Sequence, residues 1–297
     1  MARKIALLLI LFLILPCLPG HTEQMHMMQT DELAVVFEES LRGEAEHVVT
    51  MYPAIKAELE NILTWSVDFR PTAVLTVDRQ QFEKITGSRF VVAYAVPQRN
   101  LMVIDYSRTD RDLGAVIKHE LCHLLLHHRI KNGELPRWLD EGVSQWVSDG
   151  IAEILMRRKG AVLETAVLSE SLIQIRTLEK HFPDDENSLL LAYEESKSLV
   201  EFIHHQFGRD AILELLRHLQ DGHHLDEAVL QSLSIPFTEL ERRWHSHLRE
   251  KITWLTYLTN NVYGILFFLA ALITIAGFIR MSLRKKRYGG NEPSRNA

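Results

Sequence analysis

The pattern that most constrains this chain of 297 residues is His-Glu-x-x-His at positions 119–123. Residues four apart lie on the same face of an α-helix, so His119 and His123 can direct two imidazoles at one point. Neutral imidazole nitrogens at about 2.0–2.1 Å are preferred ligands of Zn²⁺. Glu120 is turned about 100° round the helix, which places its carboxylate beside a bound ion, where a general base for water is needed. The pattern therefore predicts a helix that carries a catalytic zinc site.

The residues around this motif favour a helix in the interior of a domain. Apolar side chains spread over a wide surface of the segment: Leu113, Val116, Ile117, Leu121, Leu124 and Leu125. Thr109 or Asp110 can cap its start, and Asn132-Gly133 is a typical stop. Cys122 lies beside the histidine face rather than on it, and we expect a buried structural thiol at this position.

A catalytic zinc ion usually has three protein ligands and one open position, so a further ligand is required. Pro136 fits the first turn of a second helix, which returns along the first one. At about 1.5 Å rise per residue, Glu141 comes back level with the two histidines. Asp140 is the alternative candidate for the third ligand. We expect it instead to accept a hydrogen bond from the free ring N–H of a zinc-binding histidine. The predicted ligands are therefore His119, His123 and Glu141, which together hold one Zn²⁺ per chain.

The two motifs together resemble the gluzincin metallopeptidases, in particular the peptidase MA-like domains related to the aminopeptidase N and thermolysin groups. The similarity is carried by the His-Glu-x-x-His motif and by Trp138-Leu139-Asp140-Glu141-Gly142, and it continues loosely through 192–196 to 240–244. It implies a zincin-like fold, a peptide or protein substrate and a catalytic role for Glu120. It also implies that Tyr193, at the head of a later helix, stabilises the oxyanion through its hydroxyl.

The predicted fold class is α+β, with a small mixed sheet before the zinc helix and a mostly helical lobe after it, followed by one transmembrane helix. A helix is expected at 42–65, with Pro53 as a candidate break. Strands are expected at 33–38, 72–77, 90–96 and 100–106. The resemblance implies that the last of these is an edge strand, to which an extended peptide adds by main-chain hydrogen bonds. An ordinary structural strand is an equally good interpretation of that segment.

One apolar segment precedes the predicted domain in the sequence and another follows it. Residues 1–20 are basic at Arg3-Lys4 and then apolar, as in a secretory signal, and both its removal and its retention as an anchor are left open. No charged residue occurs from 252 to 279, which is long enough for a membrane-spanning helix, and the basic run 284–287 follows. By the positive-inside rule, the C-terminal tail lies in the cytoplasm and the domain lies outside it.

The expected boundaries follow from these segments. A metallopeptidase-like domain occupies 21–251, with its sheet part near 30–108 and its zinc helices and helical lobe near 109–251. The membrane region is 252–281, and the basic tail is 282–297. The net charge of −6 comes from the acidic middle of the chain, which argues against nucleic acid as a partner. The basic tail is better suited to the anionic headgroups of a lipid bilayer.

These observations predict a membrane-anchored zinc metallopeptidase that hydrolyses peptide bonds outside the cytoplasm. Aminopeptidases of the resembled family carry a Gly-x-Met-Glu-Asn motif, whose Glu binds the free amine of the peptide. The matching segment 98–103 contains no Glu. An endopeptidase is therefore favoured over an aminopeptidase. The alternative from another class is a catalytically silent, zinc-stabilised module that binds proteins at the membrane.

Overall fold

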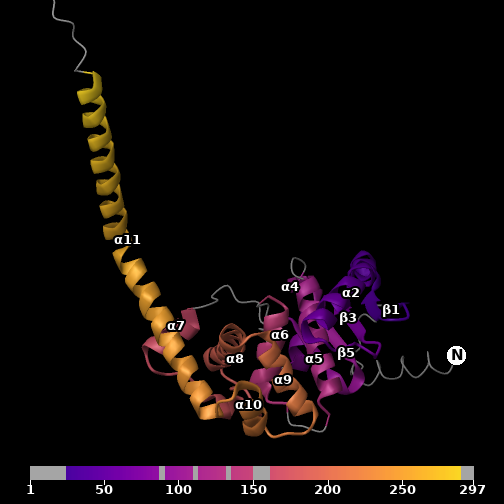
Figure 1. The fold of residues 1–297 in the computed structure, drawn as a ribbon. Coiled ribbons are helices and arrows are strands. Elements are labelled where there is room, and N and C mark those ends of the chain that lie inside the picture. The colour runs from indigo at the N-terminus through magenta and orange to yellow at the C-terminus, as the bar shows by residue number, and fades with distance from the viewer. Residues whose placement is uncertain (1–24, 87–90, 110–112, 132–134, 150–160, 289–297) are drawn as a thin grey trace, which may run out of the picture. The chain divides into compact units, whose positions relative to one another are not determined.

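The structure, a computed structural model, describes residues 25–86, 91–109, 113–131, 135–149 and 161–288 (Figure 1). The predicted signal segment lies outside the described residues. The chain divides into two compact units. The first unit comprises 1–163 with 172–237, and the second comprises 164–171 with 238–297.

The elements follow one another in an α+β order, with every described strand before the zinc helix. The strands are β1 (Met25–Gln29), β2 (Ala34–Glu38), β3 (Thr72–Thr76), β4 (Ala93–Val96) and β5 (Leu101–Asp105). The helices are α2 (Arg42–Leu63), α3 (Arg79–Thr86), α4 (Tyr106–Thr109), α5 (Leu113–Arg129), α6 (Arg137–Val147), α7 (Ala161–Leu168), α8 (Glu186–Phe207), α9 (Arg209–Gln220), α10 (Leu225–Leu233) and α11 (Phe237–Tyr288). Short 3-10 turns lie at η1 (Glu39–Leu41), η2 (Pro97–Arg99) and η3 (Ile175–Leu178).

The five strands form one mixed sheet in the order β1-β2-β3-β5-β4. The three central strands β2, β3 and β5 are parallel, whereas β1 and β4 run antiparallel to their neighbours. The prediction that the strand before the zinc helix is an edge strand is therefore wrong. Val103 of β5 is paired with Val74 on one side and with Tyr94 on the other, so β5 is interior and β4 is the edge strand.

The burial of β5 agrees with its interior position in the sheet. All five of its residues are buried, as expected of a strand that has neighbours on both sides and helices on both faces. Met102 and Ile104 are fully buried, whereas Leu101 and Val103 pack with Phe82 of α3. On the other face, α5 contacts β4 and β5, α2 contacts β2, and the two helices contact each other. The zinc helix thus rests directly on the edge of the sheet that ends in β4.

The four expected strands and the expected helix at 42–65 are confirmed, with boundaries shifted by three residues or fewer. Pro53 does not break α2, because it lies on the exposed face of that helix, where water can reach the carbonyl that its missing N–H leaves unbonded. The strand β1 and the helix α3 were not predicted. The Met-rich sequence of β1 lacks the β-branched residues on which strand prediction depends.

The helical part of the first unit is a succession of neighbours, in which α5 contacts α6, α6 contacts α8, α8 contacts α9 and α9 contacts α10. The contact between α6 and α8 is close at Gly142. A Cβ added there would lie 2.5 Å from the carbonyl oxygen of Ser196 and 2.6 Å from Val200 Cγ2. Glycine is required at this position because the two helix backbones leave no room for a side chain.

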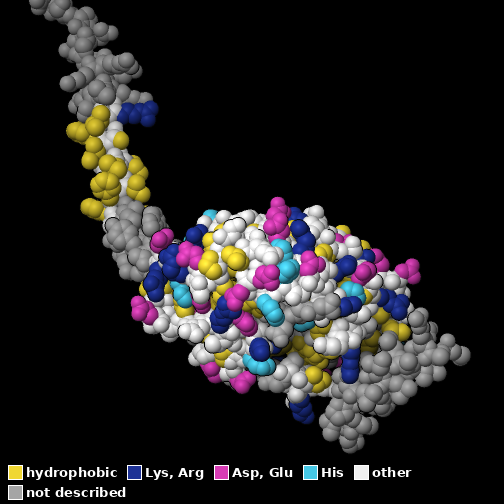
Figure 2. Space-filling view, turned by 60° about the horizontal axis from the view of Figure 1, so that its bottom comes forward, with side chains coloured by type: hydrophobic (Ala, Val, Ile, Leu, Met, Phe, Trp, Pro, Cys, Tyr) yellow, Lys and Arg dark blue, Asp and Glu magenta, His cyan; other side chains and the backbone are white. Residues whose placement is uncertain are grey.

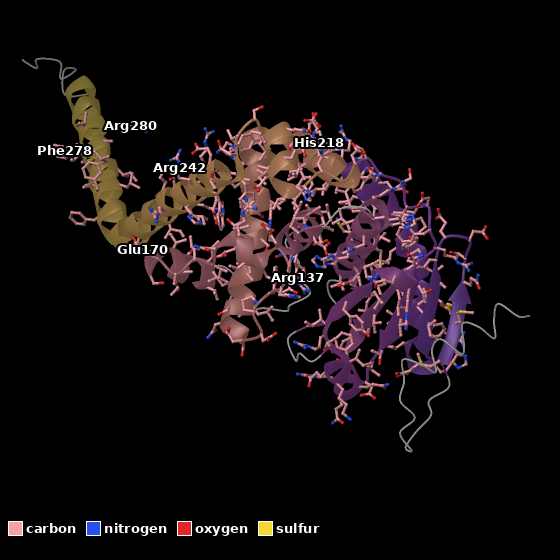
Figure 3. The ribbon with its side chains drawn as sticks, turned by 90° about the horizontal axis from the view of Figure 1, so that it is seen from below. Arg137, Glu170, His218, Arg242, Phe278 and Arg280 are labelled. Carbon is pink, nitrogen blue, oxygen red and sulfur yellow. The ribbon has the colours of Figure 1, made fainter. Side chains whose placement is uncertain are left out.

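The helix α11 changes character along its length. From 240 to 252 it buries every fourth residue: Leu240, Trp244, Leu248 and Ile252. In its second half, described apolar side chains between 262 and 281 are exposed, as Figure 2 shows. Phe278 and Arg280 both project from this part of the helix (Figure 3). Over the described residues, no helix combines the length and the hydropathy of a membrane span, so the predicted span at 252–281 stays a prediction.

We expect Gly142→Ala to lower the free energy of unfolding by about 1–3 kcal/mol, as overpacking of a core typically does. The nearest neighbour of the added methyl group is a backbone carbonyl, which cannot rotate away. This loss exceeds the gain of up to about 1 kcal/mol that alanine brings to a helix interior. Urea denaturation of the purified chain measures the difference.

The matched control is Gly114→Ala on α5, where an added Cβ would lie 3.8 Å from Ile55 and Met51, at ordinary van der Waals distance. This variant should be as stable as the parent or more stable. A Gly142→Ala variant that is as stable as Gly114→Ala would contradict the close approach of α6 and α8.

Candidate metal centre

The helix α5 presents the two histidines of the motif on one buried face. His119 is 1 % exposed and His123 is 4 % exposed. Their rings lie edge to face with centroids 4.8 Å apart, and their Nε2 atoms approach to 3.1 Å. The four-residue spacing therefore directs both imidazoles at one point, as the sequence predicts.

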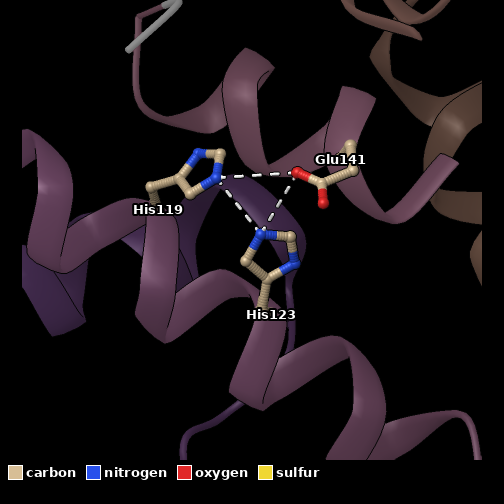
Figure 4. Close-up of side chains that lie close together, drawn as sticks. All are labelled: His119, His123 and Glu141. Carbon is tan, nitrogen blue, oxygen red and sulfur yellow. Dashed lines mark hydrogen bonds and ion pairs between the residues drawn. The ribbon is translucent and has the colours of Figure 1, made fainter. Parts of the chain in front are cut away.

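Glu141 of α6 completes this group from the opposite side (Figure 4). Its Oε2 lies 3.9 Å from Nε2 of His119 and 3.6 Å from Nε2 of His123, and the side chain is 5 % exposed. One ligand atom from each of the three residues lies within 4.8 Å of the other two. The structure thus brings together the three ligands that the sequence predicts.

The hydrogen bonds around the histidines show that this arrangement suits a cation. Nδ1 of His123 lies 2.7 Å from Asp140 Oδ1, and Nδ1 of His119 lies 3.3 Å from the hydroxyl of Ser148. When each Nδ1 carries the ring proton, each Nε2 keeps its lone pair. The lone pairs then face the carboxylate of Glu141. Zinc bonds of about 2.0–2.2 Å in a tetrahedral site separate ligand atoms by about 3.3–3.5 Å, close to the distances found here. These residues fit a single zinc ion.

Asp140 occupies the position assigned to it, beside a zinc histidine rather than among the ligands. Its Oδ2 also lies 2.9 Å from Nε2 of His127, so one carboxylate bridges two histidines. Burial alone would raise the pKa of Asp140, but the neighbouring His123 and His127 outweigh it and hold that pKa below its usual value. Asp140 is therefore an anion at neutral pH, able to accept both ring N–H groups. His127 contacts this carboxylate and, as predicted, is not part of the ligand group.

Two further residues, Ser144 of α6 and Ser148 at its C-cap, contact the histidines and were missed by the sequence reasoning. The hydroxyl of Ser144 lies 3.2 Å from Nδ1 of His123, and that of Ser148 lies 3.3 Å from Nδ1 of His119. Both serines are fully buried. Their spacing is visible in the sequence, because Asp140, Ser144 and Ser148 follow one another at the same four-residue interval as the two histidines and so share one helix face.

Glu120, the predicted general base, is fully buried on α5 between the two histidines in sequence. The preceding Lys118 is also buried and pairs with Glu58 of α2, with 2.7 Å between Nζ and Oε1. This contact fixes the rotation of α5 against α2. The rotation that buries Lys118 and both histidines also keeps Glu120 inside the protein.

Tyr193, the predicted oxyanion residue, lies in the second turn of α8 and is 4 % exposed. Its ring packs edge to face on Phe182, with centroids 5.1 Å apart. Its backbone carbonyl accepts a 3.0 Å hydrogen bond from the side-chain amide of Gln145, one helical turn after Glu141. The structure thus ties Tyr193 to the helix that supplies the third ligand, and its catalytic role stays a prediction.

Arg137, at the start of α6, is a third residue that the sequence reasoning missed (Figure 3). Its Nη2 lies 3.6 Å from Oε1 of Glu141, the oxygen that does not face the histidines. Its guanidinium also lies over the ring of Phe182, 5.1 Å from the centroid, and the side chain is 45 % exposed. Arg137 therefore places a positive charge beside the carboxylate ligand, at the solvent side of the site.

Cys122 is buried on α5, as expected from its place beside the histidine face. Burial raises the pKa of its thiol. Cys122 is not among the three residues whose ligand atoms lie together, and it packs inside the domain.

We expect the parent chain to hold one Zn²⁺ and Glu141→Ala to bind it much more weakly, because a ligand is lost. Equilibrium dialysis followed by elemental analysis gives the zinc content per chain. His218→Ala on α9 is the matched control, since it removes a histidine that is not in the ligand group (Figure 3). Equal zinc content in the Glu141→Ala and His218→Ala variants would contradict the ligand assignment.

The chain shows weak similarity to solved structures and none to curated proteins. The yeast LTA4 hydrolase in complex with bestatin shares 15 % identity, with a TM-score of 0.42 over 67 % of this chain and 33 % of that chain. The native yeast LTA4 hydrolase shares 14 % identity, with a TM-score of 0.44 over 80 % and 38 %. Aminopeptidase A of Legionella pneumophila in complex with aspartic acid shares 13 % identity, with a TM-score of 0.44 over 75 % and 27 %. The chain thus spans about a third of the length of these proteins. No curated protein matches it.

The match to a family model is stronger evidence than the similarity to solved structures. A family model described as the Peptidase MA superfamily matches residues 83–250, which is more than half of the chain. The matched region contains α5 with its two histidines, α6 with Glu141 and α8 with Tyr193. Membership of this superfamily supports a metallopeptidase-like function. The chain belongs to the Peptidase MA superfamily, as its two motifs predict.

Proposed function

We propose that this protein is a zinc-dependent metallopeptidase that hydrolyses internal peptide bonds outside the cytoplasm. The observation that carries the proposal is the convergence of His119, His123 and Glu141 on one point, with the buried Glu120 beside them. A zinc ion bound there supplies Lewis acidity that polarises the scissile carbonyl and makes water more acidic.

The protein's own residues then move the proton. Glu120 accepts a proton from the attacking water as its oxygen bonds to the carbonyl carbon. The same carboxyl group donates this proton to the nitrogen of the leaving amine as the carbon–nitrogen bond breaks. The hydroxyl of Tyr193 donates a hydrogen bond to the carbonyl oxygen while that oxygen carries negative charge. Asp140 and Ser148 hold the histidine rings in place, and Arg137 holds the carboxylate of Glu141.

The sheet edge supports a peptide as the substrate and an endopeptidase as the activity. The antiparallel strand β4 lies at the edge of the described sheet, and α5 contacts it. An extended peptide would add to such an edge through main-chain hydrogen bonds. In aminopeptidases of the resembled family a Glu binds the free amine of the peptide, and the matching segment 98–103 contains no Glu. This difference favours internal cleavage over aminopeptidase action.

The second half of α11 supports anchoring in a membrane. Leu266, Phe267, Phe268 and Leu269 are consecutive and all exposed. Because successive residues point about 100° apart, this run is apolar on every side of the helix, which a helix in water avoids. The uncharged sequence from 252 to 279 and the basic run at 284–287 complete the pattern of a single span with a cytoplasmic C-terminus.

We expect Glu120→Gln to cleave peptides at least 10²–10⁴-fold more slowly than the parent, because the amide cannot accept the proton of water. Tyr193→Phe should cost about 10²–10³-fold, as the loss of one oxyanion donor typically does. Both variants should keep the zinc content of the parent, because neither residue is a ligand. Internally quenched peptides with blocked amino termini measure the rate.

Each alternative function gives a different result in this assay. Cleavage that is confined to peptides with free amino termini would identify an aminopeptidase. A parent chain that binds zinc but cleaves neither kind of peptide would be the zinc-stabilised binding module. Undiminished cleavage by Glu120→Gln would remove the proposed mechanism.

The orientation in the membrane has its own test. Protease added outside sealed cells should digest the domain that contains Trp138, whereas a tag placed after Ala297 should stay protected. The physical reason is that the basic run at 284–287 is held at the cytoplasmic face of the bilayer. Digestion of the tag in sealed cells, with a cytoplasmic marker intact, would contradict this orientation.

A further inference from the structure

One side of α6 carries a polar series that faces the Nδ1 atoms of the metal-site histidines. Asp140 and Ser144 approach Nδ1 of His123 at 2.7 and 3.2 Å. Ser148, at the C-terminal end of α6, approaches Nδ1 of His119 at 3.3 Å. The four-residue steps of this series match the four-residue step between the histidines, because both lie on α-helices packed side by side.

The direction of the Ser148 hydroxyl proton decides which atom donates in its contact with His119. Oγ of Ser148 donates to the carbonyl oxygen of Ser144 at 2.7 Å, the shorter of the contacts. A serine hydroxyl has one proton and two lone pairs, so its lone pairs are then available to His119. Nδ1 of His119 is therefore the donor, and the ring proton stays on that nitrogen. Nε2 keeps its lone pair on the side that faces Glu141.

We propose that Ser148 is the positioning residue of His119, whose hydroxyl holds the imidazole in the orientation and tautomer that present Nε2 to a metal ion. The two histidines are thereby held by different means, since a carboxylate holds His123 and a neutral hydroxyl holds His119. A charged acceptor makes the stronger hydrogen bond, so His119 is the more weakly held ligand. The inference rests on the metal site of the proposed function but not on peptide cleavage.

The local structure allows the hydroxyl of Ser148 to be removed without disturbing the end of α6, so a positioning role can be distinguished from a structural one. The backbone N–H of Ser148 donates to the carbonyl of Ser144 at 3.3 Å, so the end of α6 keeps a hydrogen bond when the hydroxyl is removed. Ser148 is fully buried, and Ser148→Ala removes a single oxygen atom without adding bulk. Ser196 on α8 is a matched control. It is also fully buried, and its hydroxyl donates to the carbonyl of Ala192 at 2.7 Å, again four residues earlier.

The first measurement is the zinc affinity of the purified full chain by competition with a chelator. Ser148→Ala should bind zinc about 10-fold more weakly, at the lower end of the range for residues that orient a metal ligand. Ser196→Ala should bind zinc like the parent. An unchanged affinity in Ser148→Ala, or an equal loss in both variants, would overturn the assignment.

The second measurement is the NMR spectrum of the zinc-loaded chain labelled with ¹⁵N in its histidines. The parent should show slowly exchanging Nδ1 protons for both His119 and His123. Ser148→Ala should lose or broaden the signal of His119 alone, because its proton no longer has the hydroxyl acceptor, whereas the signal of His123 should remain. A His119 signal that survives unchanged would refute the inference.

The two measurements also separate this inference from the proposed function. A parent chain that binds no zinc would overturn both the metal assignment and the role of Ser148. Retained peptide cleavage in Glu120→Gln would overturn the catalytic mechanism while leaving the zinc affinity and the His119 signal as evidence for Ser148.

Discussion

The structure depends on acceptor atoms that face one another in the space between α5 and α6. Nε2 of His119 and His123 and Oε2 of Glu141 lie within 4.8 Å of one another, in a part of the core from which water is almost excluded. Groups of this kind are costly to bury together unless a cation lies between them. Because the unfolded chain cannot assemble these atoms, the binding free energy of the ion is also folding free energy. A bound ion would therefore couple the packing of α5 against α6 to its own presence.

Each face of the helix α6 contacts a different partner, so this one helix supplies a candidate ligand, hydrogen bonds to the histidines and the contact with α8. One face carries Asp140 and Ser148 toward the Nδ1 atoms of the histidines, and the next carries Glu141 toward their Nε2 atoms. A third face carries Gly142, where the backbone of α8 approaches too closely for any side chain. This division explains why a segment with many polar residues is almost wholly buried. Asp140, Glu141 and Ser144 are each directed at a histidine, and the only position of α6 without a side chain lies where two helix backbones meet.

The sequence predicts those parts of the fold that depend on local pattern. The His-Glu-x-x-His spacing and the return of a second helix are sufficient to place His119 and Glu141 at one site, because helix geometry is nearly invariant. The order of the strands could not be predicted in this way. The apolar run of β5 is compatible with either an edge or an interior strand, and only its pairing with both β3 and β4 decides. Ser148 repeats the four-residue spacing of Asp140 and Ser144, but that spacing alone does not name a partner, and only the packing of α6 against α5 shows that its hydroxyl meets His119.

The charges around the site explain why so many ionisable groups can be buried together. Glu141 and Asp140 supply two negative charges, which would balance the two positive charges of a zinc ion bound between α5 and α6. Glu120 in its ionised form adds a third negative charge, and Arg137 adds a positive charge 3.6 Å from the carboxylate of Glu141. The group is then close to neutral, which is the condition under which buried charges are tolerated. His127 extends it to the surface, since its 38 % exposed ring pairs with a carboxylate that also holds a ligand. Arg137 and His127 therefore belong to the site electrostatically although neither can bind the ion, and they mark where the buried group meets solvent.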